Sequence, residues 1–210
     1  MINIPDNHEC YKLLNKYHVP KNIIRHSEQV QKIAVYLALR LNKAGEHVDV
    51  KLVSAAALLH DIARPVDFKN YDIFNSEDVK VWKDIKRKYS GKHDIVGYNL
   101  LKDTYPEVAK IIKCHAYMVL TTKDAPMTWE EKIVNYADKR VAHERIVTLK
   151  ERFSEGKLRW KKEYPEKEET DTILTDRIHR KTEKEIFDKV QQNPEKLKDD
   201  IIKYTSEKHD

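Results

Sequence analysis

The sequence has little of what several common protein classes require. In 210 residues it contains two cysteines and four glycines, and no apolar run approaches the roughly 20 residues of a membrane-spanning helix. Cys10 and Cys114 provide no disulfide framework and favour a reducing cytoplasm. Residues 1–6 lack the charged and apolar regions of a signal peptide. We therefore expect a cytoplasmic protein without a membrane span.

Glycine-based phosphate motifs are also absent. The sequence has no GxGxxG, Walker A or CxxC pattern, which argues against nucleotide binding of the Rossmann or P-loop type. Lysine and arginine exceed aspartate and glutamate by 40 to 35, for a formal charge of +5, and the two signs are interspersed. This excess supports an anionic small-molecule substrate only weakly, and it indicates no nucleic-acid-binding face.

Apolar residues recur at helical spacing throughout the chain, which predicts an all-α fold. The length suits one domain. We place it at residues 1–155, and we expect residues 156–210 to form a charged helical extension that packs on the domain or on a second subunit of a homo-oligomer. Thr104 with Glu107, and Thr128 with Glu131, predict capping boxes at two helix starts. The residues from 194 onward are expected to fray. We expect helices near residues 8–16, 20–43, 50–64, 78–88, 92–103, 105–119, 128–154 and 170–191.

The most informative segment is LLHDIAR, residues 58–64, which follows three alanines. Its His60 and Asp61 lie side by side near the end of what should be a buried helix. Burying an imidazole and a carboxylate without partners costs several kcal/mol. A divalent metal ion removes this cost, because both groups are metal ligands. For this dipeptide taken alone, a hydrogen-bonded core pair is the favoured alternative.

Further potential ligands lie in or beside the apolar faces of other expected helices. His26, for example, aligns at helical spacing with Ile23 and Val30, where a leucine would be ordinary. Any one such histidine is more often a hydrogen-bonded core residue than a ligand. A small core would hardly satisfy several of them without a shared counter-ion, so together they favour a metal site. These additional candidates are His26, His93, His115 and Asp138.

The other histidines occupy polar or terminal positions. His143 follows Asp138 by five residues, and it either lines the same cavity or lies on a helix surface, the latter being favoured. Cys114 precedes His115, but its helical position points away from the site, so we interpret it as a packed small residue. We expect solvated side chains at His8, His18, His47, His179 and His209.

The order His26, then His60-Asp61, then Asp138 resembles the H…HD…D signature of the HD superfamily of metal-dependent phosphohydrolases. His93 and His115 resemble the additional ligands of its two-metal subset. The strings LLHDIAR, KHDIVGYNLL, IIKCHAY and IVNYADKRV are similar to small HDIG-type proteins, which include the HD-type diadenosine tetraphosphate hydrolases. The resemblance covers residues 20–155. Three departures concern the substrate and not the metal: HDIA for HDIG, Ala-Tyr-Met after His115, and the long charged stretch 66–92.

This resemblance implies an HD-domain helical bundle with a metal site in its core, bridged by Asp61. Nitrogen and oxygen ligands suit Fe or Mn, which we favour, and also Co, Ni or Zn. Two ions would hold a hydroxide that attacks a phosphoester or phosphoanhydride of a nucleotide or dinucleoside polyphosphate. In the family arrangement, one ion would bind His26, His60, Asp61 and Asp138, and the other His93, His115 and Asp61.

Three basic residues near these ligands are candidates for binding phosphate oxygens. Arg64 follows the His-Asp pair, and Lys139 and Arg140 follow the last ligand. Arginine presents a planar fork of donors that matches phosphate. We expect Asp61 and Arg64 to take part in catalysis. Each of the three basic residues could instead pair with a surface carboxylate.

The charged segment 66–92 allows two interpretations, and so does the activity of the protein. The segment is either a lid over the site or a surface helix, which we favour for residues 79–88. The favoured activity is hydrolysis of a nucleotide phosphate. The alternative is a metal-binding, nucleotide-sensing or regulatory module without turnover, which the charged C-terminal extension fits.

Overall fold

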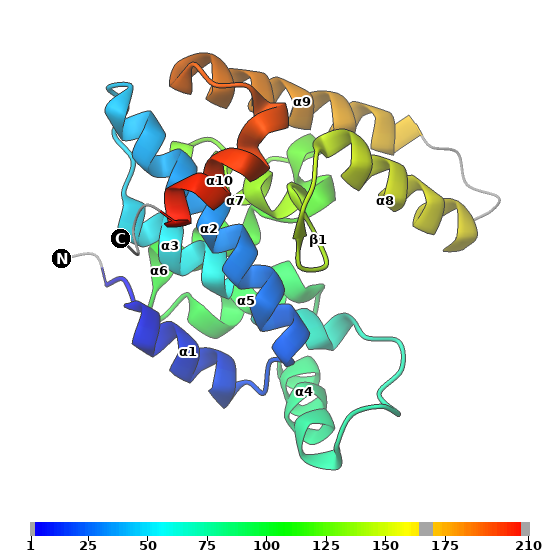
Figure 1. Cartoon of the computed structure of the whole chain (residues 1–210). Coiled ribbons are helices and arrows are strands. Elements are labelled where there is room, and N and C mark those ends of the chain that lie inside the picture. The colour runs from blue at the N-terminus through cyan, green and yellow to red at the C-terminus, as the bar shows by residue number, and fades with distance from the viewer. Residues whose placement is uncertain (1–2, 164–169, 207–210) are drawn as a thin grey trace.

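The computed structural model describes residues 3–163 and 170–206, and these are mostly helical (Figure 1). The all-α prediction is confirmed. The described residues contain one antiparallel hairpin, β1 (Val141–Ala142) with β2 (Arg145–Ile146). No helix among them is long and apolar enough to cross a membrane. The helices are α1 (Asn7–Lys16), α2 (Lys21–Lys43), α3 (Val50–Leu59), η1 (Arg64–Asp67), α4 (Ser76–Lys88), α5 (His93–Leu101), α6 (Pro106–Lys113), η2 (Tyr117–Thr121), α7 (Trp129–Lys139), α8 (Leu149–Glu163), α9 (Thr170–Val190), η3 (Pro194–Lys196) and α10 (Leu197–Ser206).

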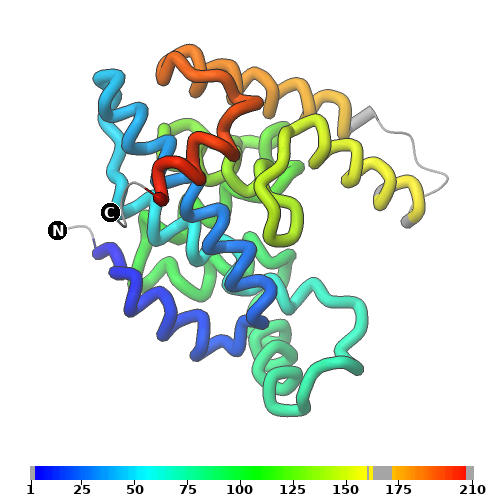
Figure 2. The backbone as a smooth tube through the Cα atoms, viewed as in Figure 1, coloured from blue at the N-terminus to red at the C-terminus, as the bar shows by residue number. Residues whose placement is uncertain are grey.

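Helix α2 is the central element of the bundle. Helices α3, α7, α9 and α10 all pack against it (Figures 1 and 2). Its Val30, Ile33, Leu37 and Leu41 are fully buried, as their helical spacing predicts. Helix α3 also packs on α6 and α7. The core therefore lies between the helices that carry most of the candidate metal ligands.

Side-chain caps fix the start of two of these helices. Asp49 caps α3 by accepting hydrogen bonds from two backbone N–H groups of the first turn. The capping box predicted from Thr128 and Glu131 is confirmed at the start of α7. The box predicted from Thr104 and Glu107 is wrong. The chain enters α6 through a proline at the first helical position, where a missing N–H costs no helical hydrogen bond.

Three helices end earlier than expected, each beside a candidate ligand. Helix α3 stops at Leu59 and α6 at Lys113, and the helix expected at 128–154 is divided by the hairpin into α7 and α8. Pro65 has no N–H and cannot extend α3 as an α-helix. His143 takes a φ of 56° in the hairpin turn, which ends helical geometry there. These breaks place the candidate ligands at helix ends.

Residues 66–92 form a packed surface unit. Trp82 is buried at its centre, with ring centroids 5.8 Å from Phe68 and 4.9 Å from Phe74. Trp82 is the one buried residue of α4, whose other side chains are partly or fully exposed. The surface-helix interpretation of residues 79–88 is therefore confirmed.

The C-terminal part of the chain departs from expectation in two ways. Residues 194–206 do not fray: α10 packs against α2 and buries Leu197 and Ile201, which lie one helical turn apart. The border expected after residue 155 falls inside α8, which continues from Leu149 to Glu163. Helices α9 and α10 cross one side of the bundle (Figure 2), so the extension completes the core.

Arg140 is a structural residue, and the prediction that it binds substrate phosphate is not supported by its position. Its side chain is only 2% exposed, and its hydrogen bonds tie α7 to the segment after the hairpin, to α9 and to η3. The guanidinium is directed to these partners because the chain turns at the end of α7. The acceptors are the Val147 and Pro194 carbonyls, the Tyr136 hydroxyl and the Glu183 carboxylate.

Arg140→Met should lower the free energy of unfolding by about 3 kcal/mol, because it removes the cation that pairs with the partly buried Glu183 carboxylate and leaves the Val147 carbonyl without its donor. Urea unfolding of the metal-free protein measures this. Lys150→Met, on the exposed face of α8, is the charge-matched control and should change stability by less than about 0.5 kcal/mol. Equal stability of the two variants would contradict the structural role of Arg140.

His179 is buried, so the expectation that it is solvated is wrong. Its ring is 0% exposed and lies 5.5 Å from the Tyr117 ring and 5.6 Å from the Phe153 ring, centroid to centroid. Neither ring nitrogen has a hydrogen-bond partner within the described chain. Burial, assisted by Lys139, lowers the pKa of His179 to about 3. His8 and His47 are exposed as expected, and His209 lies outside the described residues.

His179→Phe should stabilise the protein increasingly as the pH falls. The unfolded histidine takes up a proton near pH 6.5, whereas the buried one does so only near pH 3, so wild-type stability falls with acidification across that window. The gap between variant and wild type should widen by about 1.4 kcal/mol per pH unit below 6.5. Urea unfolding at pH 7, 6 and 5 measures it. A gap that does not depend on pH would contradict a buried neutral imidazole.

Candidate metal centre

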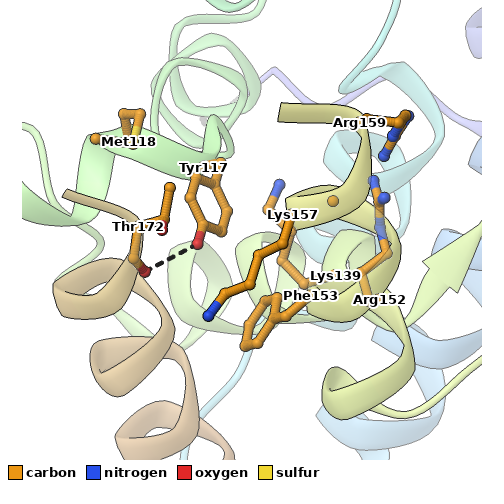
Figure 3. A pocket seen from close by; sticks show the side chains of 9 residues that line it. Tyr117, Met118, Lys139, Arg152, Phe153, Lys157, Arg159 and Thr172 are labelled. Carbon is orange, nitrogen blue, oxygen red and sulfur yellow. Dashed lines mark hydrogen bonds between the residues drawn. The ribbon is translucent and has the colours of Figure 1, made fainter. Parts of the chain in front are cut away.

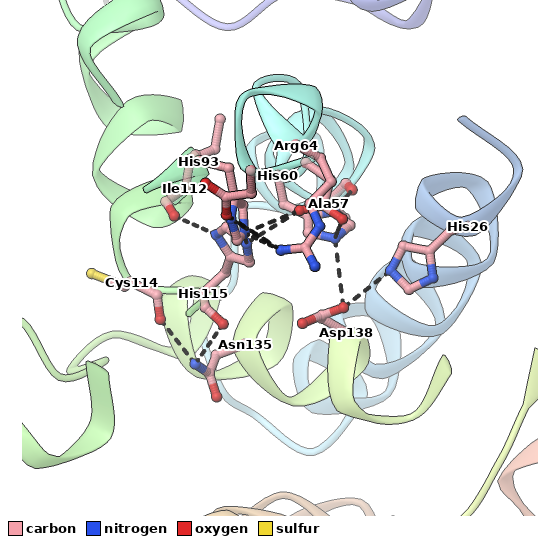
Figure 4. A network of polar contacts seen from close by, with 12 residues as sticks. His26, Ala57, His60, Arg64, His93, Ile112, Cys114, His115, Asn135 and Asp138 are labelled. Carbon is pink, nitrogen blue, oxygen red and sulfur yellow. Dashed lines mark hydrogen bonds and ion pairs between the residues drawn. The ribbon is translucent and has the colours of Figure 1, made fainter. Parts of the chain in front are cut away.

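The structure brings together all six residues predicted as metal ligands, and Figure 4 shows the four histidines and Asp138 converging. They come from five separate places in the bundle: α2, the end of α3, the start of α5, the segment after α6 and the end of α7. Five of the six are buried, and His26 is partly buried. In chain order they are His26, His60, Asp61, His93, His115 and Asp138.

The first half of the cluster is centred on Asp138. Its Oδ1 lies 3.1 Å from His26 Nε2 and 3.6 Å from His60 Nε2. His60 Nε2 also lies 3.7 Å from Asp61 Oδ2. Ligand atoms that bind one ion at about 2.1 Å are about 3 Å apart when they are neighbours in its coordination shell. His26, His60 and Asp138 are therefore spaced as a group that could hold a metal ion.

The second half is centred on the other oxygen of Asp61. Asp61 Oδ1 lies 3.3 Å from His93 Nε2 and 3.6 Å from His115 Nε2, and these two nitrogens are 3.1 Å apart. His60, Asp61 and His115 also lie close enough together to hold an ion. Asp61 thus faces both halves of the cluster with different oxygens.

The second nitrogen of each histidine is held by an acceptor. His93 Nδ1 donates to Asp67 Oδ2 at 2.5 Å, and the other three donate to backbone carbonyls. A proton on Nδ1 leaves a lone pair on Nε2, which is the tautomer that ligates a metal, and the same contact fixes the ring orientation. The carbonyl contacts are His26 to His143 at 2.8 Å, His60 to Ala57 at 2.8 Å and His115 to Ile112 at 2.5 Å.

This donor set fits a divalent cation. His60 Nε2 is fully buried and has no hydrogen-bond partner in the described residues. His93 Nε2 and His115 Nε2 face one another at 3.1 Å, and in the tautomer that ligates a metal each carries a lone pair. Buried polar atoms are rarely left unsatisfied, and opposed lone pairs beside a carboxylate repel. A cation bound by imidazole nitrogens and carboxylate oxygens resolves both defects.

The two aspartates carry negative charge despite their burial. Burial alone would raise the pKa of Asp61, but His60, His115 and His93 hold it well below its usual range. For Asp138, the effect of burial is outweighed by Lys139, His26 and His60, which also hold the pKa well below its usual range. Both carboxylates are therefore ionised and available as ligands at neutral pH.

Two of the three predicted phosphate-binding residues lie at the cluster. Arg64 is partly exposed, and its Nη1 lies 3.1 Å from His93 Nδ1 and 3.7 Å from Asp67 Oδ2. Lys139 is buried, and its ammonium donates to Asp138 and, at 3.2 Å, to the His115 carbonyl. Both line a cavity of about 400 Å³ that opens onto the candidate ligands. Arg140, the third, does not line it.

Sequence reasoning missed three positioning groups. Asp67 orients His93 from 26 residues away, and Asn135 donates to the backbone carbonyls of Cys114 and His115 at 2.9 and 3.3 Å. The His143 side chain is 75% exposed, as favoured, but its carbonyl holds His26. The packed interpretation of Cys114 is confirmed, because its thiol is buried and burial raises its pKa to about 12. Asp67 alone gave a sequence signal, as an acidic residue soon after the His-Asp pair.

Comparison with protein-family models matches residues 23–142 to the HD domain. The match covers more than half of the chain, so the protein belongs to the HD domain family. All six candidate ligands lie inside the matched region, whereas α8, α9 and α10 lie outside it. The predicted resemblance to the HD superfamily is confirmed, but a specific likeness to the diadenosine tetraphosphate hydrolases is not.

Three curated proteins are similar to part of this chain. The chain is 31% identical over 161 residues to a tRNA (cytidine(56)-2′-O)-methyltransferase of Picrophilus torridus, an alignment that covers 70% of this chain and 40% of that protein. The methyltransferase of the same name from Thermoplasma volcanium is 27% identical with the same coverage. An uncharacterised protein of Methanocaldococcus jannaschii is 27% identical over 69% of this chain and 81% of its own length. No solved structure matches.

Divalent metal should raise the melting temperature of the metal-stripped protein. An ion that binds only the native state adds about 2.7 kcal/mol at a hundredfold excess over its dissociation constant. Mn, Fe, Co, Ni and Zn are the ions to test, by differential scanning fluorimetry and by elemental analysis of the purified protein. His60→Ala should abolish the rise, whereas His8→Ala, which removes an exposed imidazole away from the cavity, should keep it. No bound metal and no rise with any ion would exclude a metal centre here.

Proposed function

We propose that the protein is a metal-dependent phosphohydrolase that cleaves a phosphoester or phosphoanhydride bond of a nucleotide. The observation that supports this most strongly is the buried cluster of four imidazoles and two carboxylates at the floor of a cavity whose wall contains Arg64 and Lys139. Burying so many imidazoles and carboxylates together is costly unless a cation binds among them. Basic side chains at the same wall suit an anionic substrate.

We favour two metal ions in this centre. His26, His60 and Asp138 would hold the first, together with Oδ2 of Asp61. His93 and His115 would hold the second with Asp61 Oδ1, in keeping with the 3.1 to 3.7 Å spacing of these atoms. Fe or Mn are favoured, and Co, Ni and Zn share the ligand preference. Divalent ions in such a site activate a water molecule as the nucleophile and neutralise the charge of the phosphate.

The chain's own residues would bind and orient the substrate. Arg64 is positioned to donate to a phosphate oxygen from the partly exposed edge of the cavity, with Asp67 and His93 limiting its motion. Lys139 keeps a positive charge beside Asp138 at the inner wall. Asp61 would be the least replaceable residue, because its two oxygens face different sets of imidazoles.

The relatives bear on the choice of substrates. Two of them carry the matched segment within proteins named as tRNA methyltransferases, of which this chain spans 40%. Short RNA oligonucleotides and RNA-derived nucleotides therefore belong in the substrate panel beside nucleoside mono-, di- and triphosphates. The modest charge of +5 favours the small nucleotides.

Phosphate release from this panel, with each ion added to metal-stripped protein, tests the proposal. We expect release from at least one nucleotide with Fe or Mn. Asp61→Ala should reduce it by more than a thousandfold and weaken binding of both ions. His93→Ala and His115→Ala should each lower metal content from two equivalents towards one, and activity should fall with it.

The control is His8→Ala, which should retain wild-type metal content and turnover because its exposed side chain on α1 lies outside the cluster and its cavity. Metal binding without release from any nucleotide or RNA would contradict the enzyme and favour the sensing module. A wild type that saturates at one equivalent under anaerobic metal excess would contradict the two-ion arrangement and leave His93 and His115 as phosphate donors.

A further inference from the structure

A second cavity adjoins the candidate metal centre. It has a volume of about 230 Å³, and it shares Tyr117, Lys139 and Arg152 with the cavity that opens onto the ligands (Figure 3). Its outer wall is formed by α8 and by Thr172 at the start of α9. Both helices lie outside the matched family region, residues 23–142. This outer wall is therefore built from helices that are not part of the matched family region.

The second cavity is strongly basic. Four cationic side chains line it, and no carboxylate does so within the part of the chain that the structure describes. Two of them are partly neutralised, because Lys139 pairs with Asp138 and Lys157 lies 3.6 Å from Asp176. The other two are Arg152 and Arg159, which has an exposed side chain.

Arg152 stands where the two cavities meet. Its Nε is buried and has no hydrogen-bond acceptor among the described residues. A buried guanidinium N–H without an acceptor is costly, and an anionic ligand would satisfy it with a charge-assisted hydrogen bond. Arg152 lines both cavities, so such a ligand would lie at the boundary between the ligand cluster and the second cavity.

The rest of the lining is apolar and partly aromatic. Tyr117 and Phe153 contribute rings, and Met118, 41% exposed, lies at the same wall as Tyr117 (Figure 3). The Tyr117 ring is held in place, since its hydroxyl donates to the Asp176 carboxylate and lies 3.1 Å from the Thr172 carbonyl oxygen. Aromatic rings beside guanidinium groups are the surroundings that bind the flat face of a nucleobase.

We propose that this second cavity binds the nucleoside part of a nucleoside 5′-phosphate, with its phosphate at the candidate metal centre and Arg152 contacting the phosphate at the boundary. This inference rests on the proposed function and names its substrate class. It assigns nucleoside recognition to α8, α9 and η2, while the family region supplies the metal ligands.

Gly156 offers a direct test, because it lines the cavity and an added Cβ would meet no atom within 4 Å. Gly156→Phe should fill the cavity without strain in α8. The probe is the phosphonate analogue of adenosine 5′-monophosphate, in which carbon replaces the ester oxygen and prevents hydrolysis. Equilibrium dialysis with metal-loaded protein should show at least tenfold weaker binding. Metal content and affinity for inorganic phosphate should stay within twofold, and Gly156→Ala should bind like wild type.

Arg152→Met provides an independent variant should the phenylalanine disturb folding. It should weaken binding of the phosphonate at least tenfold with unchanged metal content. Lys150→Met, which removes a charge from the exposed face of the same helix, should change it less than twofold.

The outcomes separate this inference from the proposed function. Phosphonate binding that Gly156→Phe abolishes, in a protein without any turnover, would support the nucleoside site and contradict the phosphohydrolase. Turnover of nucleotides with KM and phosphonate affinity unchanged by both Gly156→Phe and Arg152→Met would overturn the nucleoside site alone. Equal affinity for ribose 5-phosphate and the phosphonate would also overturn it, because the base would then contribute nothing.

Discussion

The buried carboxylate of Asp61 is the constraint on which the site depends. Its two oxygens face opposite sets of imidazoles, His60 at 3.7 Å on one side and His93 and His115 at 3.3 and 3.6 Å on the other. Segments far apart in sequence must meet at this point, and α3 ends at Leu59, directly before the His60-Asp61 pair. A bound divalent cation would compensate the cost of burying these charges and lone pairs, because it uses them as ligands.

The remaining structure divides between holding that cluster and shaping what reaches it. Helix α2 and the helices packed on it supply a dry core, and backbone carbonyls and Asp67 fix the imidazole tautomers. Outside the family region, α8 and α9 enclose a second, basic cavity next to the first. The ligands are thus built on the HD scaffold, while the proposed nucleoside site lies where α8 and α9 meet η2 of that scaffold. Function resides in such sites and not in the fold alone.

The sequence predicts a residue's position where local helical spacing sets it, and fails where contacts between distant segments set it. Helical periodicity was sufficient for His26, because a histidine among regularly spaced apolar residues has to face the core. It was insufficient for Lys139 and Arg140, because the groups that fix their side chains, the His115 carbonyl and the Glu183 carboxylate, are distant in sequence. His179 was misjudged because its burial comes from Tyr117 and Phe153, distant in sequence. Asp67 could not be paired with His93 before the tertiary structure placed them together.

The central claim is that the buried histidines and aspartates form a metal centre around Asp61. Anomalous X-ray scattering from crystals of the purified protein, collected on both sides of the absorption edge of the metal found by elemental analysis, tests it most directly. The account predicts two anomalous peaks, one within bonding distance of His60 Nε2 and one between His93 and His115, with Asp61 contacting both. Ordered side chains with no anomalous peak near His60 Nε2 would contradict it.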